Sequence, residues 1–490
     1  MTKSKRFLAL FSAVLMTAAL TAGCQSNTPG SSTTSSASSG SSTVSGDSSA
    51  PIGERPIPEE MQPTSKKIVV WMKGDSEEFK PYYDGFLADY PDYTLDYMTA
   101  ATADHVQLIQ AIQAGQGIPD AILVAPRPAD AYYTGLYQAL DYYLDNDPNY
   151  NRKDINEMAL AGNTFGGKTY FVCEDLELCA LGWNKKLFRE AGLDPEKAPR
   201  TYSEFEAASK ALTKYNSNGE ATQIGYKGNI GYWALSSAMG RYVTGRDGYT
   251  VEFDTPEIRK SFEFSKLVPS FYNNKLSMAD DESYWNPKSG HVGLFYVNLK
   301  QISQFIDENL EIGLAPWPVA DDYEGDPKIC VYSSQQYGIP KNAANPNGGW
   351  LFIRWLVTKG IGDVFNESQF NANPNGYIPQ YQSNKELREQ VNAKFKPLVT
   401  NENVLKLWEQ RDEMYEQANM FLWSDVIEGQ FHPTIWAAET QIYQGQVTIT
   451  DHCAKIQKLG EKLHKEWLDQ KLADGWVFTE DKLALIPPTE

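Results

Sequence analysis

The chain has 490 residues, and its 63 acidic side chains outnumber its 44 basic ones, which gives a net charge of −19. A surface of this sign repels phosphate groups, so the composition argues against nucleic acid and anionic lipid as partners. Only five cysteines are present, which is too few for a disulfide framework in a chain of this length.

The N-terminus begins with three basic residues and continues with the apolar run FLALFSAVLMTAAL. This run has the length of a signal-peptide core and is too short to span a bilayer. Small residues then lead directly into Cys24, and the segment resembles a bacterial lipobox with Thr21 where an aliphatic residue is commoner. The resemblance implies that residues 1–23 are removed and that Cys24 is lipidated and becomes the mature N-terminus. The alternative is an ordinary signal peptide followed by a chance cysteine.

Residues 25–50 contain 19 Ser, Thr or Gly among 26. Such a segment has almost no apolar surface to offset the entropy of ordering it. We therefore expect residues 24–65 to form a flexible tether with a root-mean-square reach of about 35 Å. The roughly 425 residues that remain exceed what a single hydrophobic core usually supports, so two lobes are expected.

The folded part begins with alternating strand and helix patterns. KIVVWM (67–72) has the apolar run of a strand, and Phe79, Tyr83, Phe86 and Tyr90 then recur at helical spacing. The next helix pattern, VQLIQAIQAGQG, ends at glycines, and the strand AILVA (121–125) follows it. This order is typical of β-α units.

The alternation continues along the rest of the chain. Residues 168–184 have an extended pattern, and Thr201 with Glu204 forms a capping box at the start of the next helix. Two more strands are expected at 292–297 and 337–340, a buried helix at 348–358, and mostly helices after residue 400. Strands separated by helices predict an α/β fold with parallel or mixed sheets.

No metal or cofactor site is expected. The five histidines lie far apart and none has a zinc-binding spacing. The stretch DNDPNYN from Asp145 is similar to the start of a calcium loop, but it lacks the glycine at position six and has Asn156 in place of glutamate at position twelve. Cys173 and Cys179 are close enough in sequence to pair, and the favoured alternative is two separate buried thiols.

Four stretches together resemble the extracellular solute-binding proteins of bacterial ABC sugar importers, the maltose-binding-protein-like family. The match extends over nearly all of residues 66–490, and it depends on the order and spacing of the motifs. The stretches are VVWMKGDSEEFKPYYDGFLADYP, GQGIPDAILVAPRPADAYYTGLYQAL, GWNKKLFREAGLDPEKAPRTYSEFEAASKALTK, and GLAPWPVADDYEGD with YGIPKNAANPNGGWLFIRWLVTKGIG and NGYIPQ.

The resemblance implies a type II periplasmic-binding-protein-like fold, in which two hinge-linked α/β lobes close over a ligand cleft. The implied N-terminal lobe comprises residues 66–176 and 330–375. The implied C-terminal lobe comprises residues 177–329 and 376–490.

A sugar site combines hydrogen-bonding groups with aromatic rings that pack on the C–H faces of the sugar. Asp75 follows the first strand and matches a sugar-bonding aspartate of the family, although Ser76 replaces the lysine that follows it there; helix capping is the alternative role. Arg127 lies where the family has an Asp-Arg pair, and it is either a surface charge or a group that selects an acidic sugar.

Two carboxylates in the first expected crossing segment are further candidates. Glu177 matches a family position that bonds sugar hydroxyls, and strand alternation places Asp175 on the same face. Both lie within an otherwise apolar stretch, where a carboxylate needs a partner. We therefore expect Asp175 and Glu177 to bind the ligand.

Aromatic candidates complete the predicted site. Tyr232 and Trp233 resemble the stacking aromatics of the second lobe, with core packing as the alternative for one of them. Trp285 has acidic and polar neighbours and is either a cleft aromatic or a loop anchor. Tyr377 and Trp436 are the candidates near the C-terminus. Trp350 and Trp355 lie in an apolar helix pattern and are expected in the core.

The resemblance implies a monomeric, lipid-anchored binder on the outer face of the cytoplasmic membrane. It would capture an oligosaccharide, deliver it to ABC permease subunits, catalyse no reaction and use no cofactor. Two alternatives stay open, a surface carbohydrate lyase or hydrolase that uses two carboxylates, and a sugar-sensing module.

Overall fold

A computed structural model of the protein describes residues 54–72, 79–99, 105–124, 128–228, 230–268, 284–307, 309–333, 335–421 and 425–488. The chain divides into two units, Met1–Gly53 and Glu54–Glu490, and all of the described residues belong to the second unit. The predicted signal peptide and Cys24 lie outside the described residues.

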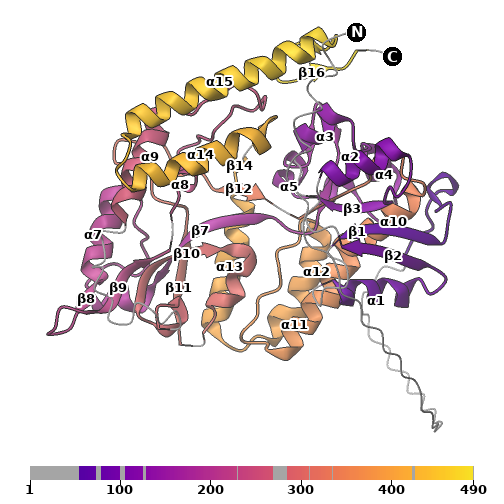
Figure 1. The fold of residues 1–490 in the computed structure, drawn as a ribbon. Coiled ribbons are helices and arrows are strands. Elements are labelled where there is room, and N and C mark those ends of the chain that lie inside the picture. The colour runs from indigo at the N-terminus through magenta and orange to yellow at the C-terminus, as the bar shows by residue number, and fades with distance from the viewer. Residues whose placement is uncertain are drawn as a thin grey trace, which may run out of the picture. The chain divides into compact units, whose positions relative to one another are not determined.

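The first sheet has five strands in the order β2-β1-β3-β13-β6. Three of them, β1, β2 and β3, are labelled in Figure 1. β1 runs parallel to both β2 and β3, whereas β13 is antiparallel to β3 and β6. Apolar residues fill both faces of β1, as expected for a central strand covered by helices on each side. The strands are β1 (Lys67–Met72), β2 (Thr94–Thr99), β3 (Ala121–Val124), β6 (Val172–Cys173) and β13 (Gln336–Gly338).

The second sheet has seven strands, in the order β14-β12-β7-β10-β9-β8 with β11 paired to β7. β7 is its central strand, and all but the first of its eight residues are buried. β9 and β10 are parallel neighbours, so their carboxyl ends lie at the same edge. The strands are β7 (Glu177–Asn184), β8 (Lys214–Tyr215), β9 (Ala221–Lys227), β10 (Val292–Asn298), β11 (Ile312–Ala315), β12 (Cys330–Ser333) and β14 (Met420–Phe421).

Helices and short hairpins account for the other regular elements. The helices are α1 (Lys80–Asp89), α2 (His105–Ala114), α3 (Pro128–Thr134), α4 (Asp141–Asn146), α5 (Glu157–Ala161), α6 (Lys185–Glu190), α7 (Tyr202–Leu212), α8 (Tyr232–Ala238), α9 (Pro256–Leu267), α10 (Pro346–Trp355), α11 (Asn366–Ala372), α12 (Lys385–Phe395), α13 (Glu402–Glu416), α14 (Glu428–Tyr443) and α15 (Ile449–Ala473). The 3₁₀ turns are η2 (Glu59–Met61), η3 (Arg152–Asp154), η5 (Pro287–Ser289), η6 (Leu299–Phe305) and η8 (Lys396–Leu398), and η7 (Leu356–Phe365) is a π-helical segment. The hairpins are β4 (Thr164–Phe165) with β5 (Lys168–Thr169), and β15 (Val477–Phe478) with β16 (Leu485–Ile486).

Local sequence signals predicted many of these elements. β1 coincides with KIVVWM, and Thr201 caps α7 by accepting a hydrogen bond from the Glu204 amide at 3.3 Å. The Glu204 carboxylate accepts from the Arg200 amide, one residue before the cap, so the capping box is only half formed. Trp350 and Trp355 are buried in the core, as predicted.

The chain passes between the two sheets at least twice. The first passage is residues 174–176, which join β6 in the first sheet to β7 in the second. The second passage joins β12 to β13. β12 pairs with β7 and β14 in the second sheet. Residues 330–375 were expected in the N-terminal lobe, which contains the first sheet.

No disulfide joins the four cysteines of the described residues, Cys173, Cys179, Cys330 and Cys453. The alternative of two separate buried thiols is therefore confirmed for Cys173 and Cys179. No helix among the described residues is both long enough and apolar enough to cross a bilayer.

The long C-terminal helix α15 touches distant parts of the fold (Figure 1). Its first half packs beside α9 and α14, where Gly460 is required because a Cβ there would lie 2.6 Å from the Phe431 ring. Its second half brings Trp467 edge-on against Tyr133, with the ring centroids 4.9 Å apart. The terminal hairpin follows, and the Leu485 amide donates to the Tyr133 hydroxyl. The C-terminus is thereby attached to α3.

Candidate ligand-binding site

A first hollow of about 410 Å³ opens at the carboxyl end of β9, where Lys227 pairs with Phe295 of β10. Open α/β sheets bind ligands at this kind of edge. Lys227 is the last residue of β9, and Gly228 turns the chain with a φ of 140°, a conformation that favours glycine. The wall is mainly aromatic and consists of Trp233, Phe295, Tyr296 and Phe305. This hollow therefore offers flat apolar surfaces beside one cation.

A second hollow, of about 440 Å³, lies between α5 and the loop that follows α8. Met158 and Ala161 of α5 form one wall. The opposite wall is more polar and comprises Gly240, Arg241, Tyr242, Thr244, Gly245, Arg246 and Glu252, with Lys328, Asn419 and Met420. This hollow offers charged and hydrogen-bonding groups together with the Tyr242 ring.

A third hollow of about 10 Å³ has room for one water molecule. It has one lining residue in common with each of the other two hollows. It shares Trp233 with the first hollow and Lys328 with the second. The Trp317 ring also lines it. We refer to the three hollows together as the trough. The two larger hollows are the volumes with room for ligand groups, and the third lies between residues that line them.

The two predicted carboxylates have partners within the protein. Asp175 is 1% exposed, and the Lys300 ammonium lies 2.8 Å from its carboxylate. Glu177 accepts a hydrogen bond of 2.6 Å from the Asn298 amide. Neither carboxylate lines the trough. Contacts inside the chain thus explain how both carboxylates are accommodated in this apolar stretch, and ligand binding by either remains a prediction.

The aromatic pair predicted at the start of α8 divides between core and trough. Tyr232 is buried and stacks on Phe262 with a centroid distance of 4.2 Å. Trp233 points elsewhere and lines two of the hollows. The core alternative therefore holds for Tyr232. Trp285 is 1% exposed and belongs to the main core, so it is a loop anchor.

Tyr377 and Trp436 lie apart from the trough. The Tyr377 hydroxyl donates to Asn366 at 2.9 Å, and burial raises the pKa of this tyrosine. Trp436 projects from α14 with 59% of its surface exposed. Asp75 and Arg127 lie outside the described residues. Roles for all four in ligand binding stay predictions.

Sequence patterns did not identify the polar wall of the second hollow. Six of its ten residues come from GRYVTGRDGYT (240–250), in which Arg241, Tyr242 and Arg246 lie among three glycines. A cluster of charged and aromatic residues among glycines is a common feature of binding loops. This feature could have identified the loop as part of a binding site. Lys328 had none, because only the fold brings it to this loop.

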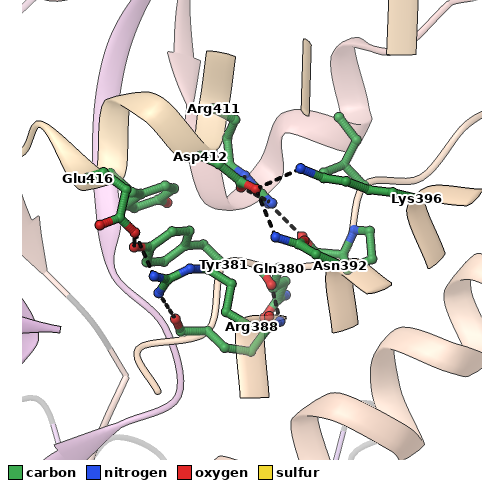
Figure 2. A network of polar contacts seen from close by, with 12 residues as sticks. Gln380, Tyr381, Arg388, Asn392, Lys396, Arg411, Asp412 and Glu416 are labelled. Carbon is green, nitrogen blue, oxygen red and sulfur yellow. Dashed lines mark hydrogen bonds and ion pairs between the residues drawn. The ribbon is translucent and has the colours of Figure 1, made fainter. Parts of the chain in front are cut away.

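A dense polar network supports the segment that leads into α12 (Figure 2). Arg411 is buried, and its guanidinium donates to Asp412 and to the Pro379 carbonyl. Glu416 accepts from Arg388 at 2.6 Å and from the Tyr381 hydroxyl at 2.7 Å. Asn392 and Lys396 also donate to Asp412.

α13, which carries Arg411, Asp412 and Glu416, also contacts the first passage between the sheets. The Tyr415 hydroxyl donates to the Leu176 carbonyl at 2.8 Å, and the Tyr415 ring stacks on Tyr381. α13 thus holds residues 174–176 and residues 379–382 through one set of contacts.

The stretch that is similar to a calcium loop has protein partners for its carboxylates. Asp145 pairs with Arg152 at 2.7 Å, and Asp147 accepts from the Trp350 indole at 2.7 Å. Among the described residues, no three His, Cys, Asp or Glu side chains are grouped so that they could hold a metal ion.

The family of the chain follows from its match to the model for the bacterial extracellular solute-binding proteins, which extends over residues 73–362. The protein belongs to this family. A comparison with curated proteins returned no match.

Solved structures of other solute-binding proteins share the fold. The sugar-binding protein MalE from Xanthomonas citri superposes with a TM-score of 0.61 at 15% identity, over 83% of this chain and 99% of that one. An ABC substrate-binding protein from Listeria monocytogenes in complex with cycloalternan has a TM-score of 0.58 at 15% identity, over 81% and 98%. The cyclic α-maltosyl-1,6-maltose binding protein from Arthrobacter globiformis has a TM-score of 0.55 at 18% identity, over 82% and 99%. The predicted two-lobe α/β fold is confirmed.

Proposed function

We propose that this solute-binding protein captures an oligosaccharide outside the cell and delivers it to the permease subunits of an ABC importer. The family supports extracellular solute binding. The solved structures with the same fold include proteins that bind cycloalternan and cyclic α-maltosyl-1,6-maltose. Both of those ligands are oligosaccharides.

The observation that carries the proposal is the composition of the trough. Trp233 and Tyr296 provide ring faces on which the C–H faces of sugars pack. Arg241 and Asn419 provide donors for sugar hydroxyls at the other end. Aromatic walls with a few polar groups are what a site for linked sugar units requires.

We propose lobes of residues 66–176 with 330–375, and of residues 177–329 with 376–490, which close over the ligand by a hinge movement. The passage at 174–176 and the contacts of α13 support a hinge at this place. Because β12 pairs in the second sheet, its residues 330–333 would move with the second lobe.

A thermal-shift screen of the purified mature chain against neutral and acidic oligosaccharides tests the proposal. A ligand at 100 times its Kd should stabilise the folded state by about 2.7 kcal/mol. Trp233→Ala should reduce or abolish the shift, because it removes a ring shared by two hollows. Tyr142→Ala, which removes an exposed ring outside the trough, is the control and should leave the shift unchanged. Peptides or polyamines that shift the melting temperature where all sugars fail would refute the proposal.

We further propose that the protein is a binder and not a lyase or hydrolase, so that it releases the bound sugar unchanged. Mass spectrometry of the oligosaccharide after prolonged incubation with the protein distinguishes these functions. Intact oligosaccharide is the expected result, and shortened or unsaturated products would establish an enzyme.

Membrane attachment through Cys24 is part of the same proposal, since a tethered monomeric binder stays close to its permease. The lipobox-like segment and the Ser-rich stretch after it support this attachment. Cys24→Ala should release the protein into the medium with its ligand affinity unchanged, as measured by fractionation and calorimetry. Retention of the variant on cells would contradict the lipid anchor.

A further inference from the structure

Basic side chains predominate around the trough, although the chain as a whole is acidic. Four cationic residues line the three hollows, and Glu252 is the only carboxylate among the described residues that line them. In the whole chain the balance is the reverse, with 44 basic and 63 acidic residues. The cations are Lys227, Arg241, Arg246 and Lys328.

The single carboxylate of the trough is already engaged. Glu252 accepts from the Arg241 guanidinium at 3.1 Å, and Glu257 lies 3.8 Å from the same group. These two contacts orient Arg241 at the wall of the second hollow. Glu252 and Glu257 offset the charge of Arg241, and Arg246 and Lys328 are the other cations that line this hollow.

Lys328 occupies the centre of the trough, since it lines both the second and the third hollow. Its backbone amide donates to the Ala238 carbonyl at 2.7 Å, which fixes its position against the end of α8. Its side chain passes Gly240, where an added Cβ would lie 3.9 Å from the lysine Cγ. None of the ion pairs between described residues involves its exposed ammonium.

Cations placed in a concave site attract anions, because the low-dielectric walls focus the field there. Guanidinium and ammonium groups bind carboxylate and sulfate through short, charge-assisted hydrogen bonds. A neutral sugar would offer these groups only hydroxyl oxygens. We infer that the ligand is an anionic oligosaccharide, whose carboxylate or sulfate group binds between Arg241, Arg246 and Lys328 while its rings extend toward Trp233. This inference rests on the proposed function.

The test compares matched ligands by isothermal titration calorimetry with the mature chain. The probes are a galacturonic-acid tetrasaccharide, the neutral galactose tetrasaccharide obtained by reducing its carboxyl groups, and a sulfated galactose tetrasaccharide. We expect one of the anionic probes to bind at least about tenfold more tightly than the neutral one. Its affinity should fall as the salt concentration rises.

Lys328→Met keeps an unbranched side chain that is one atom shorter and removes the charge. It should weaken the anionic probe about tenfold and change the affinity of the neutral probe by less than about twofold. Lys462→Met on α15, an exposed lysine outside the trough, is the matched control and should change neither affinity.

The two anionic probes identify the source of the charge, since preference for the uronate indicates carboxylate and preference for the sulfated sugar indicates sulfate. Equal or tighter binding of the neutral probe, or an anionic affinity that Lys328→Met does not change, would overturn the inference and leave the proposed function standing. Failure of all three probes together with every sugar of the thermal-shift screen would overturn both.

Discussion

Replacing Lys300 with methionine should lower the free energy of unfolding by about 3–5 kcal/mol, because the change leaves a buried carboxylate without its cation. Asp175 is 1% exposed, and its carboxylate lies 2.8 Å from the Lys300 ammonium. Glu174 is 4.0 Å from the same ammonium and accepts a hydrogen bond from the Tyr337 hydroxyl. Urea denaturation at pH 7, followed by tryptophan fluorescence, measures the effect.

The same pair predicts a sensitivity to alkaline pH. Burial alone would lower the pKa of Lys300, but the carboxylates of Asp175 and Glu174 outweigh burial and raise this pKa above its ordinary value. The folded state then holds the proton more tightly than the unfolded state. The stabilisation is complete below about pH 10, the ordinary range of lysine, and is lost as the pH rises above it. Lys300→Met should lack this alkaline loss.

Lys406→Met is the matched control for Lys300→Met. Its ammonium lies 3.6 Å from Glu402 on the surface of α13, and both side chains are exposed. Removing an exposed pair of this kind should change stability by less than about 0.5 kcal/mol. If the two variants unfold at the same urea concentration, the Lys300 contact contributes nothing beyond a surface pair.

Replacing Asp425 with alanine should also destabilise the fold by about 3–5 kcal/mol, because it leaves the buried His464 without its carboxylate partner. The carboxylate is fully buried, and both of its oxygens lie 2.9 Å from Nε2 of His464. Nδ1 of His464 lies 2.6 Å from the Gly460 carbonyl. Both ring nitrogens therefore have a partner inside the protein. The contact between Asp425 and His464 holds α15 to the segment just before α14.

Two further variants separate charge from packing at this pair. Asp425→Asn keeps an oxygen for the Ile427 amide, which donates to Asp425 at 2.7 Å, and should be less damaging than alanine. Asp469→Ala removes an exposed partner of Lys465 on the same helix and should change stability by less than about 0.5 kcal/mol. Thermal unfolding followed by circular dichroism compares the melting temperatures of Asp425→Ala, Asp425→Asn and Asp469→Ala. Equal melting temperatures for Asp425→Ala and Asp469→Ala would contradict the role of the buried pair.

The regular elements were largely predictable because their signals are local. The apolar run KIVVWM is β1, and the helical spacing after Phe79 corresponds to α1. The Thr201 cap begins α7. Each signal depends on residues within one or two turns of chain, where spacing alone determines which side chains share a face. Strand pairing was not predictable in the same way, and β12 joined the second sheet through contacts with residues far along the chain.

The candidate site shows the limits of local patterns more clearly. Tyr232 and Trp233 are neighbours with the same polar and aromatic surroundings in sequence, yet one packs on Phe262 and the other lines the trough. Which of two adjacent helical residues faces inward depends on the elements packed against the helix. Asp175 had the sequence features of a ligand group, and a lysine 125 residues later is its partner.

By itself, the sequence determined the export signal pattern, the Ser-rich stretch, the alternation of strands and helices, and the order of motifs that indicates a solute-binding protein. These properties depend on composition and on short-range spacing. Only the tertiary structure decided which charges neutralise one another and which remain around a ligand. Neither Lys300 nor Lys328 belongs to a sequence motif that predicts its role. Lys300 pairs with Asp175, whereas Lys328 lines the trough. Electrostatic interactions depend on distance through space, and the fold alone sets that distance.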